Sequence, residues 1–333
     1  MKLVDERGRV RHGCFDGPLD FNVEDFRLRG FFGREVGALR KRLALGAFSF
    51  VGIQAGNLFA GLAAVRLGYV AHVFGYLFDF ENGRLYERSA RTLPSRLAFP
   101  LQPDEGLIRF EGSSCGLRLD KSHAKEALEV EAAFGALQVK GRFQYGLSRK
   151  PLRVANPSCG DPHRFTFTEK CAPLRAESLS IRLDGVERVA DASGAVALYD
   201  WSGGYFARHT NWLWSAFAGH LEDGTPVGAN FAALVNESFY PENAFWIGDE
   251  RTRLPRVLFE VDLERPETQE WRVFTEDGLV DLRFRPLGSR GERTWLPGAK
   301  VNFRQCMGEY SGRLGTANLN GIRGLAEVHF SVW

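Results

Sequence analysis

Cysteine pairs and an excess of charge are both missing from this sequence. Its five cysteines, an odd number, include no Cys-x-x-Cys pair, so neither a disulfide framework nor a zinc ribbon is supported. The 43 Lys and Arg residues nearly balance the 41 Asp and Glu residues, which leaves a net charge of +2. This balance provides no general attraction to nucleic acid or to an anionic membrane, so we expect no dedicated binder of either.

A secretory leader and a clear membrane span are missing as well. The N-terminus is charged from its second residue and has no apolar core. Residues 43–65 form an uncharged run that is long enough to cross a bilayer as a helix. Gln54 and Asn57 interrupt this run, and its glycines favour two short strands joined by a turn. We therefore expect a cytoplasmic protein without a membrane span.

Motifs for cofactors and metals are also absent. The sequence contains no Gly-x-Gly-x-x-Gly segment, no Walker A loop and no His-Glu-x-x-His segment. These motifs would place backbone N–H groups around phosphates, or two imidazoles on one zinc ion. We expect no cofactor and no bound metal.

Glycine and aromatic residues are abundant by contrast, with 37 Gly, 27 Phe and an aromatic content of 13%. Aromatic residues favour strands, whereas glycine weakens helices. Residues 127–134 alternate between apolar and polar positions, and the pairs Asn82-Gly83 and Asp277-Gly278 are typical of tight hairpins. The sequence predicts an all-β protein of two tandem antiparallel β-barrels with few short helices, one of them near residues 33–43.

A proline-rich segment, residues 150–176, interrupts the strand pattern near the middle of the chain. A chain of 333 residues is comfortable for two domains. We therefore expect an N-terminal barrel over residues 1–170 and a C-terminal barrel over residues 171–333.

Residues 199–219 form the most informative candidate site. If this segment is a strand, Arg208, Trp212 and Trp214 share one face. An arginine can stack on indole while its guanidinium binds a carboxylate, and Asp200 is the expected partner. The segment therefore predicts either a polar anchor in an aromatic ligand pocket or a structural ion pair that closes one end of a barrel.

A second candidate segment covers residues 228–248. Asn230 and Asn236 share a strand face with small residues, and Trp246 follows. Amide side chains near the mouth of a barrel can hydrogen-bond a ligand, but they also commonly cap turns. Both interpretations stay open for this segment.

The C-terminal strand supplies a third candidate. Glu327 and His329 are two residues apart and therefore share one strand face. A carboxylate beside an imidazole raises the basicity of the ring, as a general base requires. We expect Gln305 to lie beside them, and the alternative is a solvated strand edge.

Four ordered segments resemble signatures of a bacterial family, domain-of-unknown-function family 2804. They are DWSGGYFARHTNWLW, NESFYPENAFW, FRQCMGEYSGRL and GIRGLAEVHFSVW. More distantly, the chain is similar to the hydroxyneurosporene synthase (carotenoid hydratase) and AttH-like group. This resemblance implies two tandem lipocalin-like, calycin-type barrels. It also implies a hydrophobic ligand, because the hydratase branch adds water to an isoprenoid double bond without a cofactor.

Three functions stay open. The first is binding of a lipophilic small molecule, and the second is a cofactor-independent lyase or isomerase acting on a lipophilic or isoprenoid substrate. In the second, an acid protonates a double bond and aromatic rings stabilise the carbocation. The acids would be Asp200 or Glu327, with His329, Arg208, Trp212 and Trp214 around the reacting charge. The third is a structural or partner-binding protein with filled barrels.

Overall fold

Two large antiparallel sheets make up this protein. The computed structural model describes every residue except 159–160, 239, 297–298 and 333. In the described part of the chain, one sheet has fourteen strands and the other has nine. Helices are few and short: α1 (Ala38–Ala44), η1 (Val23–Asp25), η2 (Pro94–Arg96) and η3 (Leu147–Arg149). The predicted all-β class is confirmed.

The first sheet follows the order β5-β4-β3-β2-β14-β12-β10-β9-β8-β7-β6, and β1, β11 and β13 pair beside this path. Its early strands are β1 (Gly13–Cys14), β2 (Leu45–Ala55), β3 (Leu58–Arg66), β4 (Ala71–Asp79), β5 (Arg84–Thr92), β6 (Leu97–Ala98) and β7 (Glu105–Glu111). Its later strands are β8 (Cys115–Ser122), β9 (Ala127–Phe134), β10 (Leu137–Gln144), β11 (Leu152–Ser158), β12 (Asp161–Leu183), β13 (Val186–Val189) and β14 (Val196–Tyr205).

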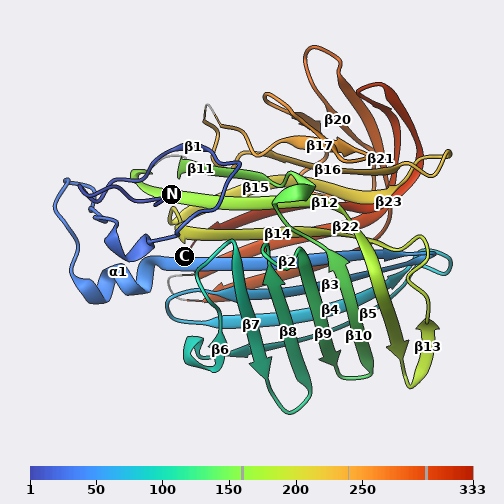
Figure 1. The fold of residues 1–333 in the computed structure, drawn as a ribbon, viewed down its shortest axis with the longest axis horizontal. Helices are drawn as coiled ribbons and strands as arrows, with labels where there is room; N and C mark the ends of the chain where they lie inside the picture. The colour runs from blue at the N-terminus through green and yellow to red at the C-terminus, as the bar shows by residue number, and fades with distance from the viewer. Residues whose placement is uncertain (159–160, 239, 297–298, 333) are drawn as a thin grey trace.

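The first sheet curls until its two halves face each other. Figure 1 shows β7 to β10 running steeply across β2 to β4. The Tyr86 hydroxyl joins the halves, since it donates to the Phe134 carbonyl at 2.9 Å and accepts from the Ala136 N–H at 2.8 Å. Gly75 on β4 has no side chain because the Phe134 ring occupies that space, 2.3 Å from where a Cβ would lie. The result is a near-closed barrel whose interior is mostly apolar.

The second sheet follows the order β18-β17-β16-β15-β23-β22-β21-β20-β19. Its strands are β15 (His209–His220), β16 (Pro226–Ala233), β17 (Ala244–Ile247), β18 (Glu250–Arg253), β19 (Leu258–Glu260), β20 (Trp271–Phe274), β21 (Val280–Leu296), β22 (Ala299–Leu314) and β23 (Ala317–Val332). It curls around a separate core that includes Phe231, Trp271, Phe284 and Tyr310. Two barrel-like units therefore follow one another along the chain, as predicted.

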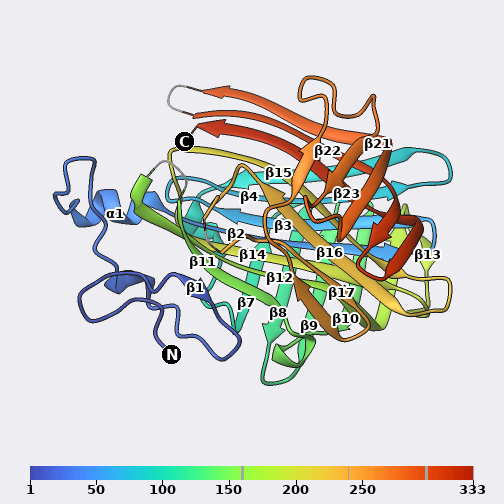
Figure 2. The same ribbon diagram turned by 90° about the horizontal axis from the view of Figure 1, so that it is seen from above.

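A third apolar layer lies between the two sheets, which pack face to face (Figures 1 and 2). The first sheet contributes Phe50, Tyr76 and Phe78 to this layer, and the second contributes Met307 and Leu325. Strand alternation sorts the second sheet into two faces, one toward its own core and one toward the first sheet. This layer is the part of the fold that positions the candidate site.

The predicted hairpin within residues 43–65 is present as β2 and β3, which pair from Ala47 opposite Arg66 to Ala55 opposite Leu58. No helix in the described part of the chain is long and apolar enough to cross a membrane. The expected domain boundary between residues 170 and 171 falls inside β12, which belongs to the first sheet. The chain passes from the first sheet to the second between Tyr205 and His209.

Candidate functional site

Most of the side chains expected at a ligand site meet on one face of the second sheet. On this face lie Trp212, Trp214, Asn230, Trp246, Gln305, Glu327 and His329. The Trp214 ring meets Phe50 of the first sheet edge-on at 5.8 Å, whereas the adjacent Leu213 belongs to the core of the second barrel. The sequence placed these side chains inside or at the mouth of a barrel. The structure places them between the sheets, because alternation tells which residues share a face but not what that face packs against.

Glu327 is the central acid of this layer. Its carboxyl group accepts a hydrogen bond from Trp212 Nε1 at 2.9 Å and another from Gln305 Nε2. Burial raises the pKa of Glu327 to about 7, because the desolvation of the charged form outweighs these two bonds and the nearby charge of Arg290. At neutral pH the acid and its carboxylate are therefore both populated.

His329 lies on the same face of β23 and stacks on the indole of Trp212. The ring centroids are 3.6 Å apart and the planes differ by 9°. Burial lowers the pKa of His329 to about 3, so the imidazole is neutral at neutral pH. The sequence predicted that Glu327 raises the basicity of this ring, and the structure shows instead that desolvation lowers it.

Asp200 has a different ionic partner from the one expected. Its carboxylate lies 2.5 Å from Lys170 Nζ, and both side chains are about nine-tenths buried or more. Lys170 and Asp200 are directly paired residues of β12 and β14. Arg208 is exposed and lies in the connection after β14, which ends at Tyr205. Asp200 therefore pairs with Lys170 instead of the expected Arg208. The expected pair required the strand to continue as far as Arg208, but β14 ends at Tyr205.

The two asparagines hold the segment that follows β16. Asn230 accepts from Trp214 Nε1 at 2.7 Å and donates to the Glu242 carbonyl at 2.6 Å. Asn236, which has a left-handed backbone conformation, donates to the Glu242 carboxyl at 2.6 Å. These contacts fix the segment over the sheet and leave Asn230 and Asn236 engaged with the protein itself.

Arg290 also belongs to this layer, although no sequence pattern pointed to it. Its guanidinium lies 4.5 Å from the centroid of Phe74 and 4.9 Å from that of Tyr76. Its Nε donates to Glu87 of the first sheet at 2.8 Å, and Phe303 lies on its other side at 5.4 Å. Arg290 therefore ties the two sheets together beside Glu327. A single arginine in a long alternating strand carries no signal of such a role.

A cleft of about 490 Å³ opens at the ends of these strands. Its lining consists of Asn211, Arg293, Thr294, Trp295, Lys300, Val301, Asn302, Phe330, Ser331 and Val332. Ser331 and Val301 lie on the same strand faces as His329 and Phe303, one alternate position further along. The cleft thus reaches the end of the layer that holds Glu327 and His329.

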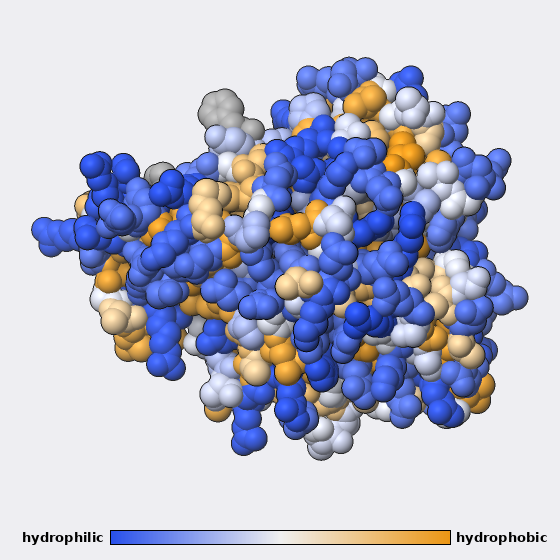
Figure 3. Space-filling model, viewed as in Figure 1, coloured by the Kyte–Doolittle hydropathy of each residue, from blue (hydrophilic) through white to orange (hydrophobic). Residues whose placement is uncertain are grey.

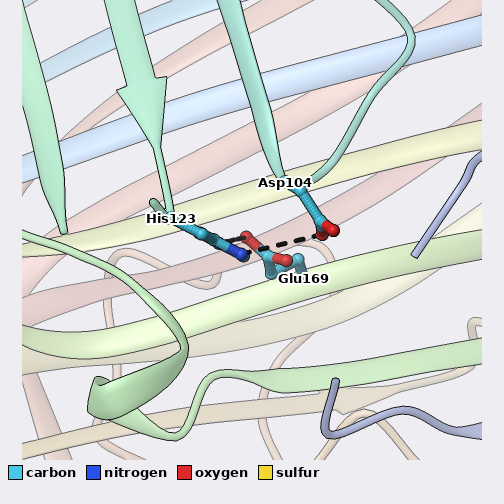
Figure 4. Close-up of side chains that lie close together, drawn as sticks. All are labelled: Asp104, His123 and Glu169. Carbon is cyan, nitrogen blue, oxygen red and sulfur yellow. Dashed lines mark hydrogen bonds and ion pairs between the residues drawn. The ribbon is translucent and has the colours of Figure 1, made fainter. Parts of the chain in front are cut away.

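A second buried polar cluster lies in the first barrel (Figure 4). His123 Nε2 lies 3.2 Å from Glu169 and Nδ1 lies 3.6 Å from Asp104. Among the described residues these three have donor atoms close enough to hold a metal ion. Arg153, fully buried, already contacts both carboxylates, with Nε 2.7 Å from Glu169. Because this guanidinium supplies the positive charge, the cluster has the arrangement of a buried ion network rather than of a metal site.

Lys121 completes the interior of the first barrel. Its Nζ lies 4.8 Å from the centroid of the Trp201 ring and 5.4 Å from that of Tyr199. It has no hydrogen-bond partner among the residues that the structure describes. Burial lowers the pKa of Lys121 to about 8, against the attraction of Glu169 and Asp104. No local pattern predicts this cluster, because its members come from distant segments of the chain.

The chain was compared with protein families, with curated proteins and with solved structures. The whole chain, residues 1–333, matches the family model described as domain of unknown function 2804 (DUF2804). A search of curated proteins found no match. Among the solved structures, kievitone hydratase from Nectria haematococca is similar with a TM-score of 0.53 and 12% identity, over 86% of this chain and 88% of that chain. At this identity the likeness shows the tandem lipocalin-like fold alone.

Proposed function

Since this chain belongs to the DUF2804 family, we propose that it is a cofactor-independent hydratase or lyase for a lipophilic molecule bound between its two sheets. The observation that carries the proposal is Glu327, a buried acid with a pKa of about 7 among aromatic rings. A general acid works best when its pKa is close to the working pH. Two uncharged N–H donors, from Trp212 and Gln305, hold the carboxyl group of Glu327.

The proposed reaction begins with proton transfer from Glu327 to one carbon of a double bond. The π electrons form the new C–H bond and leave a cation on the neighbouring carbon, which the indole faces of Trp212 and Trp214 stabilise. A water oxygen then adds to that carbon, and its extra proton returns to the Glu327 carboxylate. The net change is addition of one water, and the reverse sequence is its elimination.

Trp212 and Gln305 have a specific part in this scheme. Both donate N–H groups to the carboxyl oxygens, so they stabilise the anion that exists after proton transfer. His329 stays neutral and keeps its ring parallel to Trp212, so it adds no positive charge beside a forming cation. The name of the structural neighbour, a hydratase, supports the proposal at the level of fold only.

The test is hydration of unsaturated lipophilic probes in ¹⁸O-labelled water. Isoprenoid alcohols and prenylated phenols are incubated with purified protein, and labelled products are measured by mass spectrometry. Glu327→Gln keeps the shape but has no proton to give, so the rate is expected to fall by about 100-fold. Glu309→Gln, on the same sheet but paired with Arg285, is the matched control and keeps full activity. Equal activity of wild type and Glu327→Gln would refute the mechanism.

A second candidate is storage or transport of a lipophilic molecule without chemistry. The observation that favours it is the cleft of about 490 Å³, whose lining includes Trp295, Phe330 and Val332. Native mass spectrometry of the purified protein is expected to show a bound apolar species that organic solvent extracts. If binding occurs and no probe is converted, the carrier function replaces the catalytic one.

A further inference from the structure

Two phenylalanines stand almost fully in solvent at the tip of an N-terminal turn. Phe31 is 92% exposed and Phe32 is 88% exposed, and their rings meet edge-on at 5.2 Å. The turn is built by hydrogen bonds from the Gly30 N–H to the Arg34 carbonyl and from the Gly33 N–H to the Gly30 carbonyl. Large apolar side chains this exposed are unusual on the surface of a soluble protein unless something covers them.

The chain around this tip is strongly basic. Residues 26–45 contain six Arg and Lys residues and a single acid, Glu35, so their net charge is +5. The total for the chain is +2, which leaves −3 for all other residues. The short helix α1 belongs to this segment and exposes Leu39 and Leu43, by 71% and 43%. Positive charge and exposed apolar surface therefore coincide in one segment.

Other exposed apolar side chains gather at the same end of the molecule. Leu43 packs against the turn before β4, which carries Tyr69 at 48% exposure. Arg91, at the end of β5, hydrogen-bonds Thr294, and the next residue, Trp295, is 73% exposed. Figures 1 and 2 both place α1 and the C-terminal end of β23 at this end. In Figure 3 the same end shows hydrophilic and apolar side chains side by side.

We propose that this end docks on the surface of an anionic lipid bilayer, with Phe31 and Phe32 inserted among the lipids and the basic side chains on the headgroups. The tip is convex and presents two rings among positive charges, which suits a soft, negatively charged surface. The near-neutral total charge predicted no such attraction, because the +5 of residues 26–45 and the −3 of the remainder sum to +2. Docking stands independently of the proposed reaction.

Docking also has a consequence for access to the cleft. Trp295 lines the cleft of about 490 Å³ and lies at the docking end. A lipophilic molecule that leaves the bilayer would therefore meet this opening without crossing water. This consequence rests on the proposed function, whereas binding to vesicles is measured without any substrate.

The test is co-sedimentation of the full chain with lipid vesicles. Phosphatidylcholine vesicles containing about 30% phosphatidylglycerol are expected to bind the protein, and binding should weaken as salt rises from about 0.1 M to about 0.5 M. The protein is expected to bind pure phosphatidylcholine vesicles at least tenfold more weakly than the anionic vesicles. The double variant Arg40→Glu with Arg42→Glu, which has lost basic charge, is expected to bind the anionic vesicles more weakly than wild type by about the same factor.

The double variant Phe31→Ser with Phe32→Ser is expected to lower vesicle binding by about tenfold or more. Val186→Ser, at an exposed apolar position on β13, is the matched control and keeps full binding. All of these positions are exposed, so circular dichroism melting should be unchanged. Absence of binding to anionic vesicles, or full binding by the double variant, overturns the proposal. The proposal is also overturned if the wild-type protein binds no vesicles but self-associates in sedimentation equilibrium, and the double variant does not self-associate.

Discussion

Two buried acid clusters of this protein, one inside the first barrel and one around Glu327, solve the same physical problem in opposite ways. Inside the first barrel, Glu169 and Asp104 face the guanidinium of Arg153, so negative charge is met by positive charge. Between the sheets, the Glu327 carboxyl is held by Trp212 and Gln305, which are neutral. Burial then raises the pKa of Glu327 to about 7.

This difference separates a structural network from a site suited to proton transfer. The carboxylates of Glu169 and Asp104 are in direct contact with a buried guanidinium, and such an ion pair holds strands together. A carboxyl group among neutral donors and aromatic rings holds its proton until neutral pH and then releases it. Two measurements of stability and one of titration test this contrast.

The largest effect is expected from Arg153→Met in the first barrel. The variant leaves Glu169 and Asp104 buried without their shared cation, so the free energy of unfolding should fall by about 3–5 kcal/mol. Urea unfolding measures this loss. Arg118→Met, which removes an exposed ion pair with Asp120, is the control and should cost about 1 kcal/mol or less. A loss as small as that of the control would show that the network is not structural.

The second effect concerns the pH dependence of stability through Glu327. Its pKa is 4.5 in an unfolded reference and about 7 in the fold, so between these values only the unfolded chain loses the proton. Stability should therefore fall as pH rises from about 4.5 to about 7, by about 3 kcal/mol in total.

Glu327→Gln isolates this contribution from those of other groups, since it removes only this titration. The difference in unfolding free energy between variant and wild type should grow in favour of the variant over that pH range. His329 acts with the opposite sign over an overlapping pH range, because its pKa of about 3 in the fold penalises folding as pH falls from 6.5 to about 3. This contribution is present in variant and wild type alike, so it cancels in the difference. A difference that does not change with pH would contradict the assignment of a raised pKa to Glu327.

The smallest effect is expected from Trp212→Phe. The variant keeps a ring for His329 to stack on but removes the indole N–H that bonds Glu327. The pKa of Glu327 should rise further, by about one unit, because a donor to the anion is lost. The carboxyl stretch in infrared spectra follows this titration. Trp246→Phe loses an N–H bond to the Lys150 carbonyl instead and should leave the titration unchanged.

Much of the fold could be predicted from local pattern. Alternation identified Glu327 and His329 as sharing a strand face, and the uncharged run of residues 43–65 as a hairpin. Both inferences depend only on neighbours in the chain, so they need no knowledge of packing. The same reasoning failed for Arg208, because it required the strand to continue beyond Tyr205.

The partners of the candidate residues could not be predicted in this way. Lys170 meets Asp200 only because β12 and β14 pair in one particular register. Arg290 meets Glu87 only because the second sheet lies on the first. Register and sheet packing are set by many distant contacts at once, so no short segment contains them.

The class of fold and the content of each strand face follow from the sequence alone, because side chains alternate wherever the backbone is extended. The sequence also contains the basic, aromatic segment around Phe31, whose local charge is not apparent from the net charge of the whole chain. The burial of Glu327 between neutral donors and the exposure of Phe31 and Phe32 follow instead from the packing of the whole chain. Burial is a property of the whole packed chain, and it is burial that sets the pKa of Glu327 and the exposure of the tip.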